Sequence, residues 1–305
     1  MLAAGGTGPA AALTPAGVRK TMSELALALD PRDLAPVRTE DLMLPGPGGP
    51  LALRCYEAQT LAPAPSAGLV YFHGGIGVFG SLQTHDAVCR MLALDGALRV
   101  LAVDYRLAPE HPYPAALEDA CFATAWIAGH AARLRLRPQS LAIGGDSAGA
   151  TLATVVCRRA RDAGGPALAA QLLLCPVTDL CARTASRDQY ADGYFLSRAL
   201  LDWAVDLYCP AGIDRRDADL SPLRAPDLAG LPAAHVHTAE FDPMRDEGAD
   251  YARALAQAGV AVDYTCHAGL IHHYYGMAGA IPAARIALRQ AAQALGRALA
   301  GAPPA

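Results

Sequence analysis

The residue pattern with the clearest chemical potential is a serine between two glycines, Gly145-Asp146-Ser147-Ala148-Gly149. A short apolar run typical of a buried strand precedes it, and a run with helical spacing follows it. Glycines two residues before and after the serine permit a very sharp turn, which exposes the hydroxyl and directs the N-terminus of the helix towards it. This pattern is typical of a nucleophile that attacks a carbonyl carbon. The alternative is a serine that only caps a glycine-rich helix.

A serine hydroxyl is a poor nucleophile at neutral pH, so it needs a base, and the base needs a group that orients it. Nine histidines are candidates for the base. His272 follows the expected strand at 260–266 through a short loop, so its ring can lie over the edge of a sheet. We therefore favour His272, and His267 and His273 remain alternatives on sequence alone.

The base follows the expected strand at 260–266. The acid that orients it is expected just after the preceding strand, at 233–239. Asp242 stands directly at the end of that strand. Asp246 and Glu247 fall inside the following helix, where a carboxylate stabilises the helix N-terminus from the solvent side. We predict that Ser147, Asp242 and His272 form a catalytic triad.

An oxyanion formed at the attacked carbonyl also needs hydrogen-bond donors. The amide of Ala148, the first residue of the helix after the serine, can supply one. The segment HGGI at 73–76 follows an earlier expected strand, where bare backbone N–H groups can face the same point. We expect the other donors to come from this loop.

Short apolar runs alternate with helix-like segments along most of the chain, which predicts a mostly parallel sheet covered by helices on both faces. The expected strands are 67–72, 98–105, 140–145, 170–176, 233–239 and 260–266, after two earlier ones at 43–47 and 51–58. The expected helices are 84–95, 112–130, 147–163, 243–258 and 281–300. Two further helical segments, 15–29 and 197–208, do not fit the alternation and are expected to lie outside the sheet.

Composition excludes several classes of function. The chain has 305 residues, is 53% hydrophobic and carries a net charge of −4, so it can bury a large core and has little attraction for nucleic acid. Its densest basic run, RLRLR at 133–137, is interpreted as the solvated end of a strand or helix. No run of 18 apolar residues predicts a membrane span, and the N-terminus does not resemble a secretory signal.

The cysteines point to a reducing environment. There are eight of them without a C-x-x-C pair, so we expect free thiols in the cytoplasm, no disulfide framework and no zinc site. We expect no metal and no organic cofactor.

The chain resembles the hormone-sensitive-lipase-like branch of the α/β-hydrolases, the bacterial family IV carboxylesterases, from about residue 67 onward. The segments that carry the resemblance are HGG…GSLQTHDAVCRMLA, VDYRLAPEHPYPAALED, GGDSAGATLA, LSPLRAPDLAGLPAAHVHTAEFDPMRDEG and GLIHHYYG. The resemblance implies an α/β-hydrolase fold with a mostly parallel sheet of about eight strands, flanking helices and a helical cap. It also implies the roles given above to Ser147, Asp242 and His272, and an oxyanion hole formed by the amides of Gly75, Ile76 and Ala148.

The resemblance further implies hydrolysis of small-molecule esters of short- to medium-chain acids by an acyl-enzyme mechanism. Relatives are often dimers, so a homodimer is one expected assembly. Asp104, Arg106 and Glu110 are expected to form a packing and ion-pair network at a structural corner, and His73 to support its loop.

We divide the chain into N-terminal cap helices (1–45), a first part of the core (46–182), a cap insertion (183–219) and a second part of the core (220–305). The cap is expected to bound the acyl pocket. Candidate residues lining this pocket are Tyr190, Tyr194, Phe195, Leu196, Trp203 and Leu207.

Two residues depart from the family pattern. Members usually carry H-G-G-G and then a bulky residue, whereas here Ile76 replaces the third glycine and Gly77 takes the bulky position. We expect a negative φ at Ile76, with its amide in the oxyanion hole and its side chain narrowing the pocket on the alcohol side. His273 stands where the family commonly has glycine, and we expect it to point to solvent; the alternative is that it perturbs the pKa of the base.

Two other functions remain open on sequence alone. The same site could cleave amides or deacetylate a small molecule. The fold also serves as a non-catalytic receptor in plants, but such receptors typically lose the triad histidine, which is present here as His272.

Overall fold

The computed structural model describes residues 13–62 and 64–301. They form one eight-stranded sheet with the order β1-β2-β4-β3-β5-β6-β7-β8. The strands are β1 (Val37–Gly46), β2 (Gly49–Ala58), β3 (Ser66–Phe72), β4 (Arg99–Val103), β5 (Leu136–Asp146), β6 (Ala170–Leu174), β7 (Ala233–Phe241) and β8 (Val262–Ile271). β1 and β2 are antiparallel to their neighbours, and β3 to β8 run parallel. The predicted α/β-hydrolase architecture is confirmed.

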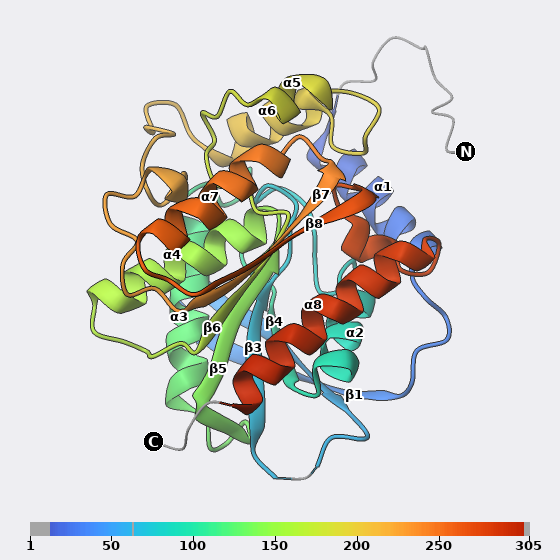
Figure 1. Cartoon of the computed structure of the whole chain (residues 1–305), viewed down its shortest axis with the longest axis vertical. Coiled ribbons are helices and arrows are strands. Elements are labelled where there is room, and N and C mark those ends of the chain that lie inside the picture. The colour runs from blue at the N-terminus through green and yellow to red at the C-terminus, as the bar shows by residue number, and fades with distance from the viewer. Residues whose placement is uncertain (1–12, 63, 302–305) are drawn as a thin grey trace.

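Helices cover both faces of the sheet (Figure 1). The helices are α1 (Pro15–Leu29), α2 (Asp86–Gly96), α3 (Ala115–Gly129), α4 (Ala148–Asp162), α5 (Ala185–Gln189), α6 (Arg198–Tyr208), α7 (Arg245–Gln257) and α8 (Pro282–Ala300), with short 3₁₀ helices at Pro222–Arg224 and Tyr274–Met277. α3, α4 and α7 pack into one apolar core and α2 and α8 into the core on the opposite face. α1, α5 and α6 lie beyond the carboxyl ends of the strands, at the top of Figure 1.

The N-terminal region is less helical than expected. Residues 1–12 of the expected cap segment lie outside the described residues, and only Pro15–Leu29 of the remainder is a helix. Residues 37–46 form the edge strand β1, which pairs along its whole length with β2. The sequence analysis did not predict a strand over the charged segment VRTEDL. These charges suit an exposed edge of a sheet. Asp41 lies opposite Arg54 and accepts a hydrogen bond of 2.6 Å from it.

Among the described residues, the predicted corner contains separate ion pairs and not one network. Arg106 Nε donates to Asp119 at 2.9 Å, and Glu110 pairs with Arg19 of α1 at 2.7 Å. Arg19 also donates to the carbonyl oxygens of Val78 and Ala108, which ties α1 to the loop after β3. The prediction is wrong for Asp104, which makes no ion pair with any residue in the described part of the chain.

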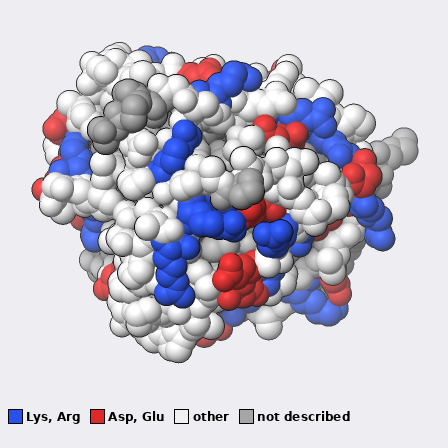
Figure 2. All heavy atoms as spheres, turned by 90° about the horizontal axis from the view of Figure 1, so that it is seen from below, with Lys and Arg blue, Asp and Glu red and all other residues white. Residues whose placement is uncertain are grey.

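The surface carries charges of both signs. On the face shown in Figure 2, Lys and Arg side chains are interspersed with Asp and Glu and do not merge into a continuous basic surface. Within residues 13–62 and 64–301, no helix combines the length and apolar character that crossing a bilayer requires. The eight cysteines are all free.

Two buried histidines make the stability of the fold sensitive to acid. Burial lowers the pKa of His73 to about 4 and that of His237 to about 3. Both pKa values lie below the value of about 6.5 in the unfolded chain. The unfolded chain therefore binds protons first as the pH falls below about 6.5, and the stability contributed by each neutral ring is lost between that pH and the folded pKa. We expect the free energy of unfolding to fall by about 2 kcal/mol per histidine between pH 7.5 and pH 5. Urea denaturation at the two pH values measures this, and equal free energies would contradict it.

Candidate active site

The nucleophile candidate Ser147 lies at the sharp turn between β5 and α4. Its backbone has φ 53° and ψ −122°, a strained conformation for a residue with a side chain. A Cβ atom at Gly145 or at Gly149 would lie 2.3 Å or 2.0 Å from the carbonyl oxygen of Phe72. The two glycines therefore let the turn pack against the end of β3, as the sequence pattern predicts.

The structure brings the three predicted triad residues together. Ser147, Asp242 and His272 each come one residue after a parallel strand ends, so they share one edge of the sheet. The distance from Ser147 Oγ to His272 Nε2 is 3.2 Å, and that from His272 Nδ1 to an oxygen of Asp242 is 2.9 Å. All three side chains are buried, and the amide of Met244 donates to the other oxygen of Asp242 at 2.8 Å. This geometry suits proton transfer from the serine to the imidazole.

The alternative acids serve other contacts. Asp246 accepts hydrogen bonds from the amide of Ser186 and from Arg245. Glu247 is buried, which raises its pKa to about 7, and it pairs with Arg187 of α5.

The alternative base His267 lies on β8 and interacts with His237, 3.2 Å away. Neither ring lines the cavity at Ser147. Among the three candidates for the base, only His272 lies within hydrogen-bond distance of both Ser147 and Asp242.

The loop after β3 presents its backbone towards the serine. Gly75, Ile76 and Gly77 have φ values of 115°, 54° and 68°, and the amides of Val78 and Phe79 both donate to the carbonyl of Gly75. In the described part of the chain, the amides of Gly75 and Ile76 donate to no protein acceptor. They are therefore available to an oxyanion, together with the amide of Ala148 at the N-terminus of α4.

The expected negative φ at Ile76 is wrong. The residue adopts a left-handed conformation at a strain of about 1–3 kcal/mol, and its side chain is buried against Val78, Leu196 and other apolar residues, whose packing offsets the strain. A bulky residue cannot stand one position later, because a Cβ atom at Gly77 would lie 2.5 Å from the ring of Tyr208. This explains why glycine and the bulky residue have exchanged places.

Asp146, which the sequence analysis did not single out, holds this loop in place. It accepts hydrogen bonds from Tyr71 Oη at 2.6 Å and from the amide of Gly74 at 3.0 Å, and His85 Nε2 lies 3.3 Å away. Burial by itself would raise the pKa of Asp146, but the charge and hydrogen bond of His85, with the bond from Tyr71, lower it to about 2. Its position inside the G-D-S-A-G turn was the only available signal.

His273 does not point to solvent as expected. It lines the cavity at Ser147, where its ring stacks on Phe195 at 5.0 Å between centroids. Burial, and then the nearby His85, lower its pKa to about 3. Its φ of 66° explains why glycine is common at this position.

Two narrow cavities meet at Ile76, with volumes of about 40 and 30 Å³. The first contains Ser147 and His272 and is closed by Met22, Leu25 and Ala26 of α1. The second lies beside Ala148 and is bounded by Tyr208, Leu220 and other residues. Because Ile76 borders both, its side chain separates the two sides of the nucleophile.

Residues 69–276 match a family model described as alpha/beta hydrolase fold. The chain belongs to this family, in its hormone-sensitive-lipase-like branch.

Relatives of this α/β-hydrolase are esterases by name. The carboxylic ester hydrolase LipN of Mycobacterium tuberculosis is 43% identical over 79% of this chain and 65% of its own length. The esterase LipI of the same organism is 42% identical over 85% of this chain and 82% of its own length. The crystal structure of a thermostable esterase from Pseudomonas putida ECU1011 superposes with a TM-score of 0.91 at 36% identity, covering 97% of this chain and 93% of that one.

The pocket of this α/β-hydrolase contains only two of the six residues predicted to line it. Phe195 and Leu196 line the cavity at Ser147. The other four line neither cavity. Tyr190 and Tyr194 pack against Phe241. Trp203 and Leu207 pack against the apolar cluster that includes the buried residues of α6.

Other residues that line the cavities were missed by the sequence analysis. They include Met22, Leu25, Leu200, Tyr208, His85 and Tyr275. The sequence analysis placed α1 in the cap over the acyl pocket, but it singled out no residue of the apolar face that Met22, Leu25 and Ala26 form at helical spacing.

Proposed function

We propose that this protein is a carboxylesterase that hydrolyses small esters of short- to medium-chain acids. The observation that carries the proposal is the line of hydrogen bonds from Ser147 through His272 to Asp242, opposite unoccupied backbone amides. The names of the relatives support the reaction class.

The proposed reaction is acyl transfer in two steps. His272 accepts the proton of Ser147 as its oxygen attacks the ester carbonyl, and the amides of Gly75, Ile76 and Ala148 stabilise the oxyanion. His272 then returns the proton to the leaving alcohol. Water attacks the acyl-enzyme by the same route, and the free acid leaves. Asp242 keeps the imidazole in the correct tautomer and stabilises its cation throughout.

Narrow cavities on the two sides of Ile76 support a preference for small substrates. Each methylene that fits or fails to fit changes the transition-state energy by only about 1–3 kcal/mol, so we propose a graded preference for acids of roughly C2–C8 rather than a sharp limit. A series of p-nitrophenyl esters of increasing acyl length tests this, with the Ser147→Ala protein as the blank. Paired ester and amide substrates distinguish an esterase from an amidase or deacetylase.

The side chain of Ile76 should restrict the alcohol part of the substrate. An Ile76→Gly variant should fold, because glycine adopts the observed left-handed conformation without strain. We expect the ratio of kcat/KM for a bulky branched-alcohol ester to that for a methyl ester to rise by roughly 10–100-fold. Steady-state kinetics on both esters of one acid measures this ratio.

An Ile76→Val variant is the matched control, since it keeps the β-branch and loses one methyl group. Its ratio should remain close to that of the parent protein. If the glycine variant shows no relative gain on the bulky ester, the side chain of Ile76 does not limit the alcohol side.

We retain the proposed division into a core and a cap, with the cap formed by α1 and residues 183–219 and with β1 assigned to the core. The contacts of Met22, Leu25, Phe195 and Leu196 with the cavity support it. The free thiols support a location in the cytoplasm. A homodimer without nucleic-acid partners remains our proposed assembly, and light scattering of the purified protein tests it.

A further inference from the structure

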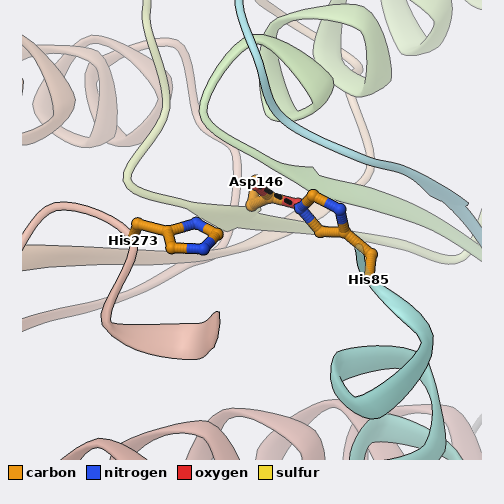
Figure 3. Close-up of side chains that lie close together, drawn as sticks. All are labelled: His85, Asp146 and His273. Atoms are coloured by element: carbon orange, nitrogen blue, oxygen red, sulfur yellow. Dashed lines mark hydrogen bonds and ion pairs between the residues drawn. The ribbon is translucent and has the colours of Figure 1, made fainter. Parts of the chain in front are cut away.

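A second cluster of ligating side chains lies in the cavity at Ser147. His85, Asp146 and His273 each offer one ligating atom, and these atoms lie within 4.8 Å of one another. The three residues come from different parts of the chain: the segment before α2, the end of β5 and the loop after β8. Figure 3 shows the two imidazole rings on either side of the carboxylate. None of the three acts as acid, base or nucleophile in the proposed reaction.

Thr84 holds the ring of His85 with its Nε2 atom towards this cluster. Thr84 Oγ1 donates to the carbonyl of Ser81 at 3.1 Å, so it can accept from His85 Nδ1, which lies 2.9 Å away. We therefore assign a proton to Nδ1. His85 Nε2 and an oxygen of Asp146 lie 3.3 Å apart as a hydrogen-bonded ion pair, with the Nε2 proton between them. A metal cation bound between these two atoms would replace that proton.

The surroundings of the cluster match those of known metal sites. Ligating imidazoles and carboxylates are usually fixed by outer hydrogen bonds, which Thr84 supplies for His85, and Tyr71 and Gly74 supply for Asp146. Ligands at about 2.0–2.2 Å in a tetrahedral zinc site stand about 3.3–3.5 Å apart, close to the 3.3 Å between His85 and Asp146. A ring nitrogen of His273 lies within 4.8 Å of the other two ligating atoms and can supply the third ligand, and all three residues line the cavity.

We propose that His85, Asp146 and His273 bind a divalent transition-metal ion of the Zn²⁺ class, and that the bound ion excludes esters from Ser147. Two imidazoles and one carboxylate favour Zn²⁺, Cu²⁺ or Ni²⁺ over Mg²⁺ and Ca²⁺, which require more oxygen ligands. The inhibitory half of the proposal rests on the proposed esterase function, whereas the binding half does not.

Calorimetric titration of the full-length protein with Zn²⁺ tests the binding half. The variant is His273→Gly, because the φ of 66° at this position suits glycine and the fold should persist. We expect the dissociation constant of one site to increase at least 10–100-fold in this variant. A His111→Gln protein is the control, since His111 is exposed and does not line the cavity, and its affinity should equal that of the parent protein. Equal affinities in the parent and the His273→Gly protein would overturn the proposal.

A competing site consists of Cys175, Asp242 and His272, whose ligating atoms also lie within 4.8 Å of one another. Co²⁺ distinguishes the two, because coordination by the Cys175 thiolate adds a charge-transfer band in the near ultraviolet. We expect no such band, and we expect a Cys175→Ala protein to bind Co²⁺ as the parent does. A thiolate band that disappears in Cys175→Ala would assign the metal to the triad and overturn the proposal.

Kinetics tests the inhibitory half. Zn²⁺ should inhibit competitively against a small ester, with an inhibition constant that matches the calorimetric dissociation constant and rises by the same factor in His273→Gly. Inhibition that is unchanged in this variant would overturn this half. A protein that binds Zn²⁺ as expected but hydrolyses no ester would refute the proposed function and leave the metal site standing.

Discussion

Replacing His272 by alanine is expected to lower kcat for a small ester by roughly 10⁵–10⁶-fold. The imidazole lies 3.2 Å from the hydroxyl of Ser147 and 2.9 Å from Asp242, so its loss removes both the proton acceptor and its link to the acid. A His273→Ala variant should change kcat/KM by only about tenfold, mainly through KM, because that ring contributes to the cavity wall. Steady-state rates of both variants on one p-nitrophenyl ester provide the comparison.

The neighbouring histidine serves as the control for this prediction. The two residues are adjacent, and loss of either removes the same atoms from the same loop. A larger loss of kcat in the His273 variant than in the His272 variant would mean that the base has been assigned to the wrong ring.

Replacing Asp242 by asparagine is expected to lower kcat by roughly 10⁴-fold, with little change in KM. The amide cannot accept the Nδ1 proton of His272 as the carboxylate does, so the ring adopts the wrong tautomer and its cation loses a stabilising charge. Asparagine has nearly the same shape as aspartate, so the backbone contact to Met244 can persist.

An Asp246→Asn protein is the matched control, because it makes the same chemical change four residues further along. Asp246 contacts Ser186 and Arg245 and does not line the cavity, so kcat should fall by no more than a few-fold. Comparable losses in the two variants would show that the acid is not specifically Asp242.

Most of the framework was predictable from the sequence because strands and catalytic residues follow strong local rules. Apolar runs predicted all six parallel strands within a few residues, and α1 within the described range. Ser147 and Asp242 were predictable because each stands at the end of such a run, and His272 because it follows the last run through what was expected to be a short loop. The alternation of strands and helices then places them at one edge of the sheet.

The conformation at Ile76 was not predictable from its residue type. A β-branched residue disfavours a positive φ, and the compensating effects are tertiary: apolar packing around its side chain and the ring of Tyr208 against Gly77. The position of His273 was not predictable either. We expected this polar side chain to point to solvent, but its ring stacks on Phe195 of the cap.

The pocket residues were the least predictable part of the site. Aromatic residues in the cap segment look alike in sequence, and whether Tyr190 packs on Phe241 or faces the serine depends on how the segment folds back. The contribution of α1 depends on Arg19, whose contacts with Val78 and Glu110 lie 59 and 91 residues away in the chain.

Covalent trapping is the most direct test that one hydroxyl, activated by one imidazole, performs the chemistry. The protein is treated with a p-nitrophenyl phosphonate ester, and the adduct is located by mass spectrometry of the digested chain. We predict a single adduct on Ser147, formed far more slowly in the His272→Ala protein. An adduct on another residue, or ester hydrolysis that survives in Ser147→Ala, would contradict the assignment.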